Sequence, residues 1–261
     1  MVKMSDTNLP LASTLVKFPG DTYMCDRCDQ RTRRQFLALT AVSVVAGMAG
    51  QGLMSKPANA SGKGTSMTPD EALAMLKEGN ARYVAEPQLC ETELELRRAQ
   101  VAKGQAPWAA ILSCADSRVP PELVFGGVNV GELFVCRNAA NIADFATIGT
   151  IEYGTEHLGV PLVVVLGHTR CGAVAAACEA ALKGAKFTGY LGQLIDSIMP
   201  VAKELCKEGQ PTLDVIRGSA RRTAEVIAND SEVVKRLVSE GKVKVVSAMY
   251  DIDTGVVEFI G

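Results

Sequence analysis

Two short segments of the chain carry side chains that could hold a metal ion. In "SCADSRV", Cys114, Asp116 and Arg118 occupy alternate positions directly after an apolar run, and in "GHTRCG", His168 and Cys171 follow a second apolar run. Two thiolates and one imidazole are good zinc ligands, and a catalytic zinc site uses three protein ligands and keeps a fourth position open. If the two segments meet in space, Cys114, His168 and Cys171 form a zinc centre.

Asp116 and Arg118 indicate that such a centre would do chemistry. An arginine holds a carboxylate with two parallel hydrogen bonds, which would keep Asp116 ionised and directed at the metal or at a water molecule on it. Taken singly, each feature has an ordinary structural explanation. A buried Cys is usually a small apolar residue, a His beside a strand end is often structural, and Asp-x-Arg is a common surface ion pair. Their joint occurrence after two apolar runs favours the metal site.

The apolar runs before these segments are predicted to be strands of one sheet. "WAAILSC" (108–114) and "PLVVVLGH" (161–168) are short and free of charge, and "ELFVCRN" (132–138) is interpreted as another strand. Continuous apolar runs are typical of a parallel sheet that is covered on both faces. Open α/β sheets bind ligands beyond the carboxyl ends of their strands. If the strands that end at Cys114 and His168 are neighbours, these two residues and Cys171 come together there.

Helical patterns alternate with these strands. They cover residues 68–86, 91–104, 171–184, roughly 189–207 and roughly 211–239, and a hairpin with Asp253-Thr254-Gly255 in its turn covers 242–261. Strands that alternate with helices indicate an α/β fold with crossover connections. We therefore predict a single α/β domain with a mostly parallel central sheet flanked by helices, an N-terminal helical arm and a C-terminal hairpin.

Composition limits the classes of function. The chain has 261 residues, of which 48% are hydrophobic and 21% charged, and its net charge of −2 gives no basic surface for nucleic acid. We expect no nucleic-acid partner. Eight cysteines are too few and too scattered for a disulfide scaffold. The cysteines outside the two segments are interpreted as core or incidental residues: Cys25, Cys28, Cys90, Cys136, Cys178 and Cys206.

The first sixty residues have the features of an export signal. Arg33 and Arg34 precede a long apolar stretch, and Ala58-Asn59-Ala60 forms a small-x-small cleavage pattern. The paired arginines resemble a twin-arginine signal, which the export machinery reads as an address. The alternative is a transmembrane helix, since the stretch is long enough to span a bilayer, but its glycines and Ala-x-Ala end favour removal. We predict a leader over 1–60, a mature domain over 61–261, and a periplasmic or secreted protein.

Together the two segments resemble the β-class carbonic anhydrases, whose pattern is Cys-x-Asp-x-Arg followed later by His-x-x-Cys. Four further segments resemble parts of the same family: "GNARYV", "GELFVCRNAAN", "IEYGTEHLGV" and "YDIDTG". The resemblance covers nearly all of residues 68–261. It implies zinc-dependent interconversion of carbon dioxide and bicarbonate by a homodimer or a higher even homo-oligomer, in which N-terminal helices embrace the partner subunit.

The resemblance also implies a role for each matching residue. Cys114, His168 and Cys171 would hold zinc, which lowers the pKa of a bound water molecule toward ~7. Asp116, held by Arg118, would accept a hydrogen bond from the resulting hydroxide and orient it toward carbon dioxide.

Four more residues match the substrate pocket of some members of this family. Gln105 matches a glutamine that hydrogen-bonds the substrate, which some members supply from the partner subunit. Phe134, Ala139 and Tyr153 match apolar and aromatic positions that line the narrow pocket.

One position departs from the members that carry a second, non-catalytic bicarbonate pocket. Those members have a Trp where this chain has Ile111, although Arg137, which matches another element of that pocket, is present. We therefore expect no bicarbonate inhibition of that type.

Two other functions are compatible with the same residues. The same fold and zinc could act on a related heterocumulene such as carbon disulfide or carbonyl sulfide, and pocket access would decide between these substrates. A non-enzymatic zinc-binding or thiol-buffering protein is the other alternative. The pairing of Asp116 with Arg118 disfavours it, because storage needs no aimed carboxylate.

Overall fold

The computed structural model describes residues 65–85, 94–209 and 212–260. Outside these ranges lie the predicted leader over 1–60 and three of the cysteines, Cys25, Cys28 and Cys90. Among the helices within the described ranges, none combines the length and the apolar character that crossing a membrane requires.

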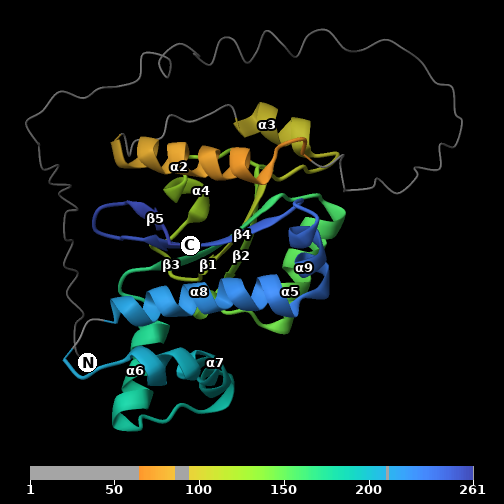
Figure 1. Ribbon diagram of the computed structural model, residues 1–261. Helices are drawn as coiled ribbons and strands as arrows, with labels where there is room; N and C mark the ends of the chain where they lie inside the picture. The colour runs from red at the N-terminus through yellow and green to blue at the C-terminus, as the bar shows by residue number, and fades with distance from the viewer. Residues whose placement is uncertain (1–64, 86–93, 210–211, 261) are drawn as a thin grey trace, which may run out of the picture. The chain divides into compact units, whose positions relative to one another are not determined.

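A five-stranded sheet forms the centre of the domain (Figure 1). Its strands are β1 Ala109–Cys114, β2 Leu133–Asn138, β3 Leu162–His168, β4 Lys244–Tyr250 and β5 Val257–Phe259. They lie in the order β2-β1-β3-β4-β5, with the first four parallel and β5 antiparallel to β4. The predicted mostly parallel sheet with a C-terminal hairpin is therefore confirmed.

Helices connect and cover these strands. They are α2 Pro69–Ala85, α3 Leu94–Val101, α4 Pro121–Val124, α5 Phe145–Glu152, α6 Gly172–Lys183, α7 Gly189–Leu205, α8 Leu213–Asp230 and α9 Glu232–Ser239. A short 3₁₀ turn, η1 Ala139–Asn141, follows β2, and a π-helical turn, η2 Tyr153–His157, follows α5. Helical periodicity did not predict α4, α5 or these two turns, each of which is at most eight residues long.

The sheet is buried on both faces, as the continuous apolar strands predict. On one face, alternate residues of β1 and β3 such as Ile111 and Val164 pack with Leu76 of α2 and with Phe125 beside α4. On the other face, the intervening residues of the same strands, such as Val163, pack with α5, α8 and α9. Figure 1 shows α2 and α4 on one side of the sheet and α8 on the other. Every residue of β1 and β3 is buried.

Helix α2 is joined to the rest of the domain through Asn80. This buried side chain donates hydrogen bonds to the carbonyl oxygens of Val124 (3.0 Å) and Gly255 (2.9 Å), and it accepts one from the amide of Val257 (2.8 Å). The N-terminal helix is thereby tied to α4 and to the C-terminal hairpin.

The predicted helical stretch over 211–239 is wrong at one point, because Ser231 divides it into α8 and α9. Ser231 has extended backbone angles, and its hydroxyl accepts a hydrogen bond from the amide of Val234 (3.1 Å), which caps the new helix. The same hydroxyl donates to Glu152 at 2.7 Å. Apolar periodicity continues across the break, so the pattern reads as one helix.

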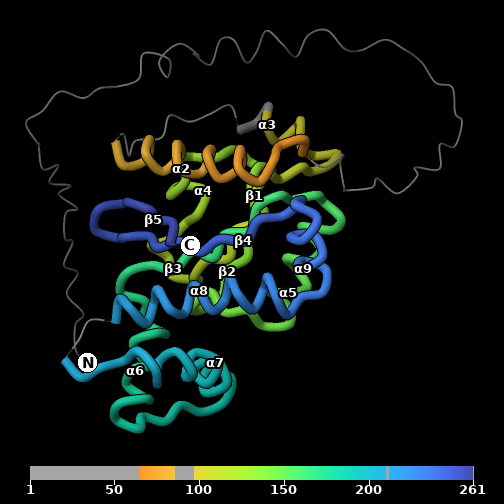
Figure 2. The backbone as a smooth tube through the Cα atoms, viewed as in Figure 1, coloured from red at the N-terminus to blue at the C-terminus, as the bar shows by residue number. Residues whose placement is uncertain are grey.

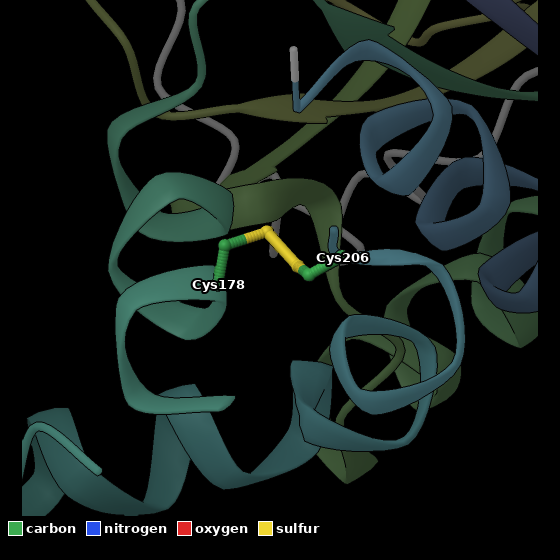
Figure 3. The surroundings of a disulfide bond; sticks show 2 residues. All are labelled: Cys178 and Cys206. Atoms are coloured by element: carbon green, nitrogen blue, oxygen red, sulfur yellow. A yellow bond between two sulfur atoms is a disulfide. The ribbon is translucent and has the colours of Figure 1, made fainter. Parts of the chain in front are cut away.

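A disulfide bond joins Cys178 of α6 to Cys206, the residue that follows α7 (Figure 3). The two residues are 28 positions apart in the chain. Helices α6 and α7 pack against each other, and the backbone trace brings the end of α7 back beside α6 (Figure 2). Cys178 is a core residue, in line with the interpretation of these cysteines as core or incidental, but the sequence patterns did not predict that Cys178 and Cys206 are bonded to each other.

Candidate metal centre

The carboxyl ends of β1 and β3 bring the predicted metal ligands together. The two strands are parallel neighbours, and they end at Cys114 and His168 respectively. Cys171 lies three residues after His168, at the cap position of α6. The sulfur atoms of the two cysteines and a ring nitrogen of His168 all lie within 4.8 Å of one another, and all three residues are buried.

His168 presents to this cluster one ring nitrogen that no described residue hydrogen-bonds. Its Nδ1 lies 2.9 Å from the carbonyl oxygen of Thr169. A carbonyl only accepts hydrogen bonds, so Nδ1 carries the proton and Nε2 keeps its lone pair. Nε2 is buried and has no hydrogen-bond partner among the described residues. A buried polar atom without a partner is costly, and a metal ion in the cluster would satisfy it.

The two cysteine sulfurs compete for one proton. A hydrogen bond from Cys171, assisted by the backbone amide of Ala140, lowers the pKa of Cys114 to about 4. The same contact, together with burial, raises the pKa of Cys171. A cation that binds both sulfurs as thiolates ends this competition. Two sulfurs and one imidazole nitrogen fit zinc, whereas magnesium and calcium prefer oxygen ligands.

The loops around the cluster are held in unusual backbone conformations. Within the described ranges, three non-glycine residues have a positive φ, namely Ala140 (61°), Asn141 (47°) and Arg170 (58°). Ala140 and Asn141 form part of η1, and the Ala140 amide donates to the sulfur of Cys114 at 3.4 Å. Arg170 lies between the two ligands of the His-x-x-Cys segment. Such conformations cost about 1–3 kcal/mol each and persist only where the surroundings impose them.

The C-terminal hairpin fixes the His-x-x-Cys segment from outside. Thr169 donates its amide to the carbonyl of Tyr250 (2.9 Å), and its hydroxyl accepts from the amide of Ile252 (3.0 Å). The guanidinium of Arg170 pairs with Asp253 at 2.5 Å. These contacts explain how the left-handed conformation of Arg170 is maintained.

The structure also brings Asp116 and Arg118 into a two-point ion pair. Nε of Arg118 donates to Oδ1 of Asp116 at 2.9 Å, and Nη2 donates to Oδ2 at 2.7 Å. These hydrogen bonds hold the pKa of Asp116 well below its usual range. Oδ2 lies 3.9 Å from Nε2 of His168, so the carboxylate faces the cluster.

The sequence matches a known family over most of the described domain. Residues 109–257 match the family described as "Carbonic anhydrase". The chain belongs to the carbonic anhydrase family. "Carbonic anhydrase 2" of Mycobacterium tuberculosis is 36% identical over 189 residues, which cover 72% of this chain and 90% of that protein. The carbonic anhydrase of Mycolicibacterium smegmatis is 34% identical over 191 residues, covering 73% and 92%.

Solved structures place the chain in the β class of this family. A structure from a study of two tetrameric β-carbonic anhydrases of Sordaria macrospora has a TM-score of 0.56 and 26% identity, and the match covers 74% of this chain and 98% of that one. The resemblance drawn from the motifs is therefore confirmed, and so is the expectation that the chain is an enzyme of the carbonic anhydrase family.

Three of the four predicted pocket residues of this carbonic anhydrase lie away from its own metal cluster. Phe134 is paired with Ala110, four residues before Cys114, which is about 13 Å along the strand. Tyr153 lies beside Phe134, with ring centroids 6.3 Å apart. Gln105 precedes β1, at the amino end of the strand that carries Cys114 at its carboxyl end.

The fourth pocket residue lies close to the cluster. Ala139 begins η1 and directly precedes Ala140, whose amide contacts the sulfur of Cys114. Among the residues that touch the site, the sequence motifs did not single out Thr169 or Ala140. Both act through their backbones, and neither residue type carries a chemical signal.

Proposed function

We propose that this chain is a zinc-dependent enzyme that catalyses the reversible hydration of carbon dioxide to bicarbonate and a proton. The observation that carries the proposal is the buried Nε2 of His168, for which the described part of the chain offers no hydrogen-bond partner. It stands with two cysteine sulfurs at the end of the sheet, and the carboxylate of Asp116 lies 3.9 Å away.

Cys114, His168 and Cys171 would hold the metal. When bound, a zinc ion with an open position lowers the pKa of a water molecule toward ~7. Thr169 keeps the proton of His168 on Nδ1 and so leaves Nε2 available as a ligand. The amide of Ala140 donates to the sulfur of Cys114, which favours the thiolate.

Asp116 would orient the water molecule that attacks carbon dioxide. Its ionised carboxylate accepts a hydrogen bond from this water, so that a lone pair of the water oxygen points toward the substrate carbon. Arg118 holds the carboxylate in this direction with two hydrogen bonds. Because the pKa of Asp116 is held below its usual range, the acceptor stays ionised at neutral pH.

We further propose that the active enzyme is a homodimer or a higher even homo-oligomer. Gln105, Phe134 and Tyr153 lie toward the amino ends of the strands, so a complete pocket needs a second chain to bring these residues to the metal cluster. Gln105 of the partner subunit would then donate to the substrate oxygen where charge develops. The tetrameric state of the Sordaria macrospora relatives supports an oligomer.

We also propose that the chain is exported by the twin-arginine machinery and acts in the periplasm or outside the cell. The paired arginines and the cleavage pattern within 1–60 carry this proposal. The disulfide between Cys178 and Cys206 supports it, because structural disulfides persist in oxidising compartments.

The test is an assay of the purified, zinc-loaded protein against two substrates. We expect one zinc per chain and rapid hydration of carbon dioxide, with slow or no hydrolysis of carbon disulfide. Cys171→Ala should lose zinc and activity together. Cys136→Ala is the matched control, since Cys136 is another unpaired cysteine that lies outside the cluster. Faster turnover of carbon disulfide, or zinc binding without either activity, would refute the proposal.

A further inference from the structure

Arg137 of β2 reaches across the sheet to the segment that joins a metal ligand to the acidic residue. Its position is paired with Ser113 in the parallel register of β1 and β2. The Nε of Arg137 donates to the carbonyl oxygen of Cys114 at 3.0 Å, and its Nη2 donates to the carbonyl oxygen of Asp116 at 2.5 Å. One guanidinium thus spans the carbonyls on either side of Ala115.

This contact lies where the sheet stops supporting the backbone. The last ladder hydrogen bond from β1 to β2 is donated by the amide of Ala115 to the carbonyl of Asn138 (2.9 Å). Beyond Ala115 the chain leaves the strand, and a turn bond from Val119 to the carbonyl of Asp116 (3.1 Å) is the next backbone support. Arg137 therefore adds a side-chain hydrogen bond to the Cys114–Ala115 and Asp116–Ser117 peptide groups, and a single guanidinium joins the two.

The orientation of these peptide groups sets the geometry of the site. The two bonds of Arg137 restrain the Cys114 and Asp116 carbonyls relative to each other, and these carbonyls belong to the two residues that carry the sulfur and the carboxylate. A guanidinium suits this task because its donors form a rigid planar fork, whereas a lysine ammonium is a single flexible point.

We propose that Arg137 is a positioning residue: by restraining the backbone, it holds the zinc ligand Cys114 and the carboxylate of Asp116 in a fixed position relative to each other. This role rests on the proposed function, and it does not require Arg137 to touch the substrate. Loss of a residue that orients a metal ligand without binding the metal itself typically costs about 10- to 100-fold in activity or metal affinity.

The experiment compares Arg137→Lys and Arg137→Gln with a matched control. Arg221→Lys is the control, because the Nε of Arg221 also donates to a backbone carbonyl, that of Ile260 at 3.1 Å, away from the site. We expect both Arg137 variants to bind one zinc per chain, with kcat for carbon dioxide hydration reduced about 10- to 100-fold and KM changed by less than about threefold. Cobalt(II)-loaded Arg137 variants should show shifted visible absorption bands, and Arg221→Lys should match the wild type in both readouts.

Two results would overturn the role of Arg137. The first is an unchanged kcat and cobalt spectrum in both variants. The second is a loss of zinc with an unchanged kcat per bound zinc, since this would assign Arg137 to metal retention alone. A zinc-loaded wild type that does not hydrate carbon dioxide would instead refute the proposed function, and the cobalt spectra of the variants would still decide the positioning role.

Discussion

Oδ2 of Asp116 lies 3.9 Å from Nε2 of His168, while Arg118 holds both oxygens of the same carboxylate. Two ligands of one tetrahedral zinc ion, each about 2.1 Å from the metal, lie closer together, at about 3.4 Å. Asp116 is therefore slightly farther from His168 than a second ligand of the same zinc ion would be. Because Arg118 holds both oxygens of this carboxylate, we expect the fourth position to stay open to water, and the predictions for the two charged residues follow from this expectation.

The first prediction concerns the loss of the carboxylate charge. Asp116→Asn should keep one zinc per chain, because the three ligands remain, but should lower kcat/KM for carbon dioxide hydration about 100-fold or more, because the ionised hydrogen-bond acceptor that orients the water is gone. Zinc analysis and stopped-flow hydration measure both quantities. Asp70→Asn, which alters a carboxylate paired with Lys244 at the surface, is the control. Full activity in Asp116→Asn would rule out the orienting role.

The second prediction concerns the release of the carboxylate. Arg118→Ala removes both side-chain hydrogen bonds that hold Asp116 away from the cluster. Asp116 should then move inward and occupy the fourth position, so that activity falls although zinc stays bound. X-ray absorption at the zinc edge or a crystal structure of the variant reports the ligand set. An unchanged set of three protein ligands with an open fourth position would contradict this prediction.

The third prediction concerns the pH dependence of stability in the metal-free protein. Arg118 lowers the pKa of Asp116 in the folded state, so the ion pair favours folding above the ordinary carboxyl pKa of about 3.9, and this contribution is lost as the pH falls. Urea unfolding of wild type and Arg118→Ala should therefore differ most above about pH 5, and the difference should shrink toward pH 3. A difference that grows on acidification would show the opposite sign and refute the assignment.

The metal centre could be predicted from the sequence because each of its ligands follows from a pattern within one short segment. Apolar runs locate β1 and β3, parallel strands end at one edge, and Cys114 and His168 occupy those ends. The same reasoning fails for residues whose partners depend on three-dimensional register. The sequence predicts that Arg137 lies in a strand, but it does not predict which residue of the neighbouring strand is paired with it. In the structure Arg137 is paired with Ser113, and from this position its guanidinium reaches two carbonyls of the segment that follows β1.

Two other features cannot be predicted from the sequence, for physical reasons. Cys178 and Cys206 are bonded because α6 and α7 pack together, and helix packing of this kind cannot be derived from the spacing of two cysteines. Arg170 and Ala140 adopt positive φ without being glycine. Their conformations are imposed by contacts made elsewhere in the fold, whereas local propensity predicts an ordinary backbone.

The fourth prediction concerns the pocket that two chains would share. Gln105→Ala should impair every site, and Cys171→Ala should remove every metal. If Gln105 acts on the partner subunit's cluster, a mixed dimer has one site with both an intact metal cluster and an intact Gln105. Mixing the two inactive variants under conditions of subunit exchange should then restore up to about half of wild-type activity. If Gln105 serves its own chain or has no role, mixing should restore nothing beyond the sum of the two variants.

The fifth prediction couples export to the disulfide. The cytoplasm keeps thiols reduced, whereas compartments outside it allow disulfides to form. Exported protein should therefore begin near Ser61 and contain the bond between Cys178 and Cys206. Arg33→Lys with Arg34→Lys should leave an uncleaved, zinc-loaded and active enzyme inside the cell, with both of these cysteines reduced. Arg97→Lys with Arg98→Lys is the matched control, since it alters a second arginine pair that lies within the folded domain.

The disulfide gives this prediction a second readout besides location. A bond between residues 28 positions apart restricts the unfolded chain, which stabilises the fold by roughly 3–4 kcal/mol. The retained, reduced enzyme should have a free energy of unfolding lower by about that amount, and oxidation of Cys178 with Cys206 in vitro should restore it. Peptide mapping without reduction identifies the bond, and N-terminal sequencing identifies the cleavage site. Normal export of the Arg33→Lys, Arg34→Lys variant, or a mature protein that retains residues 33–53, would refute the twin-arginine assignment, because that signal depends on its paired arginines.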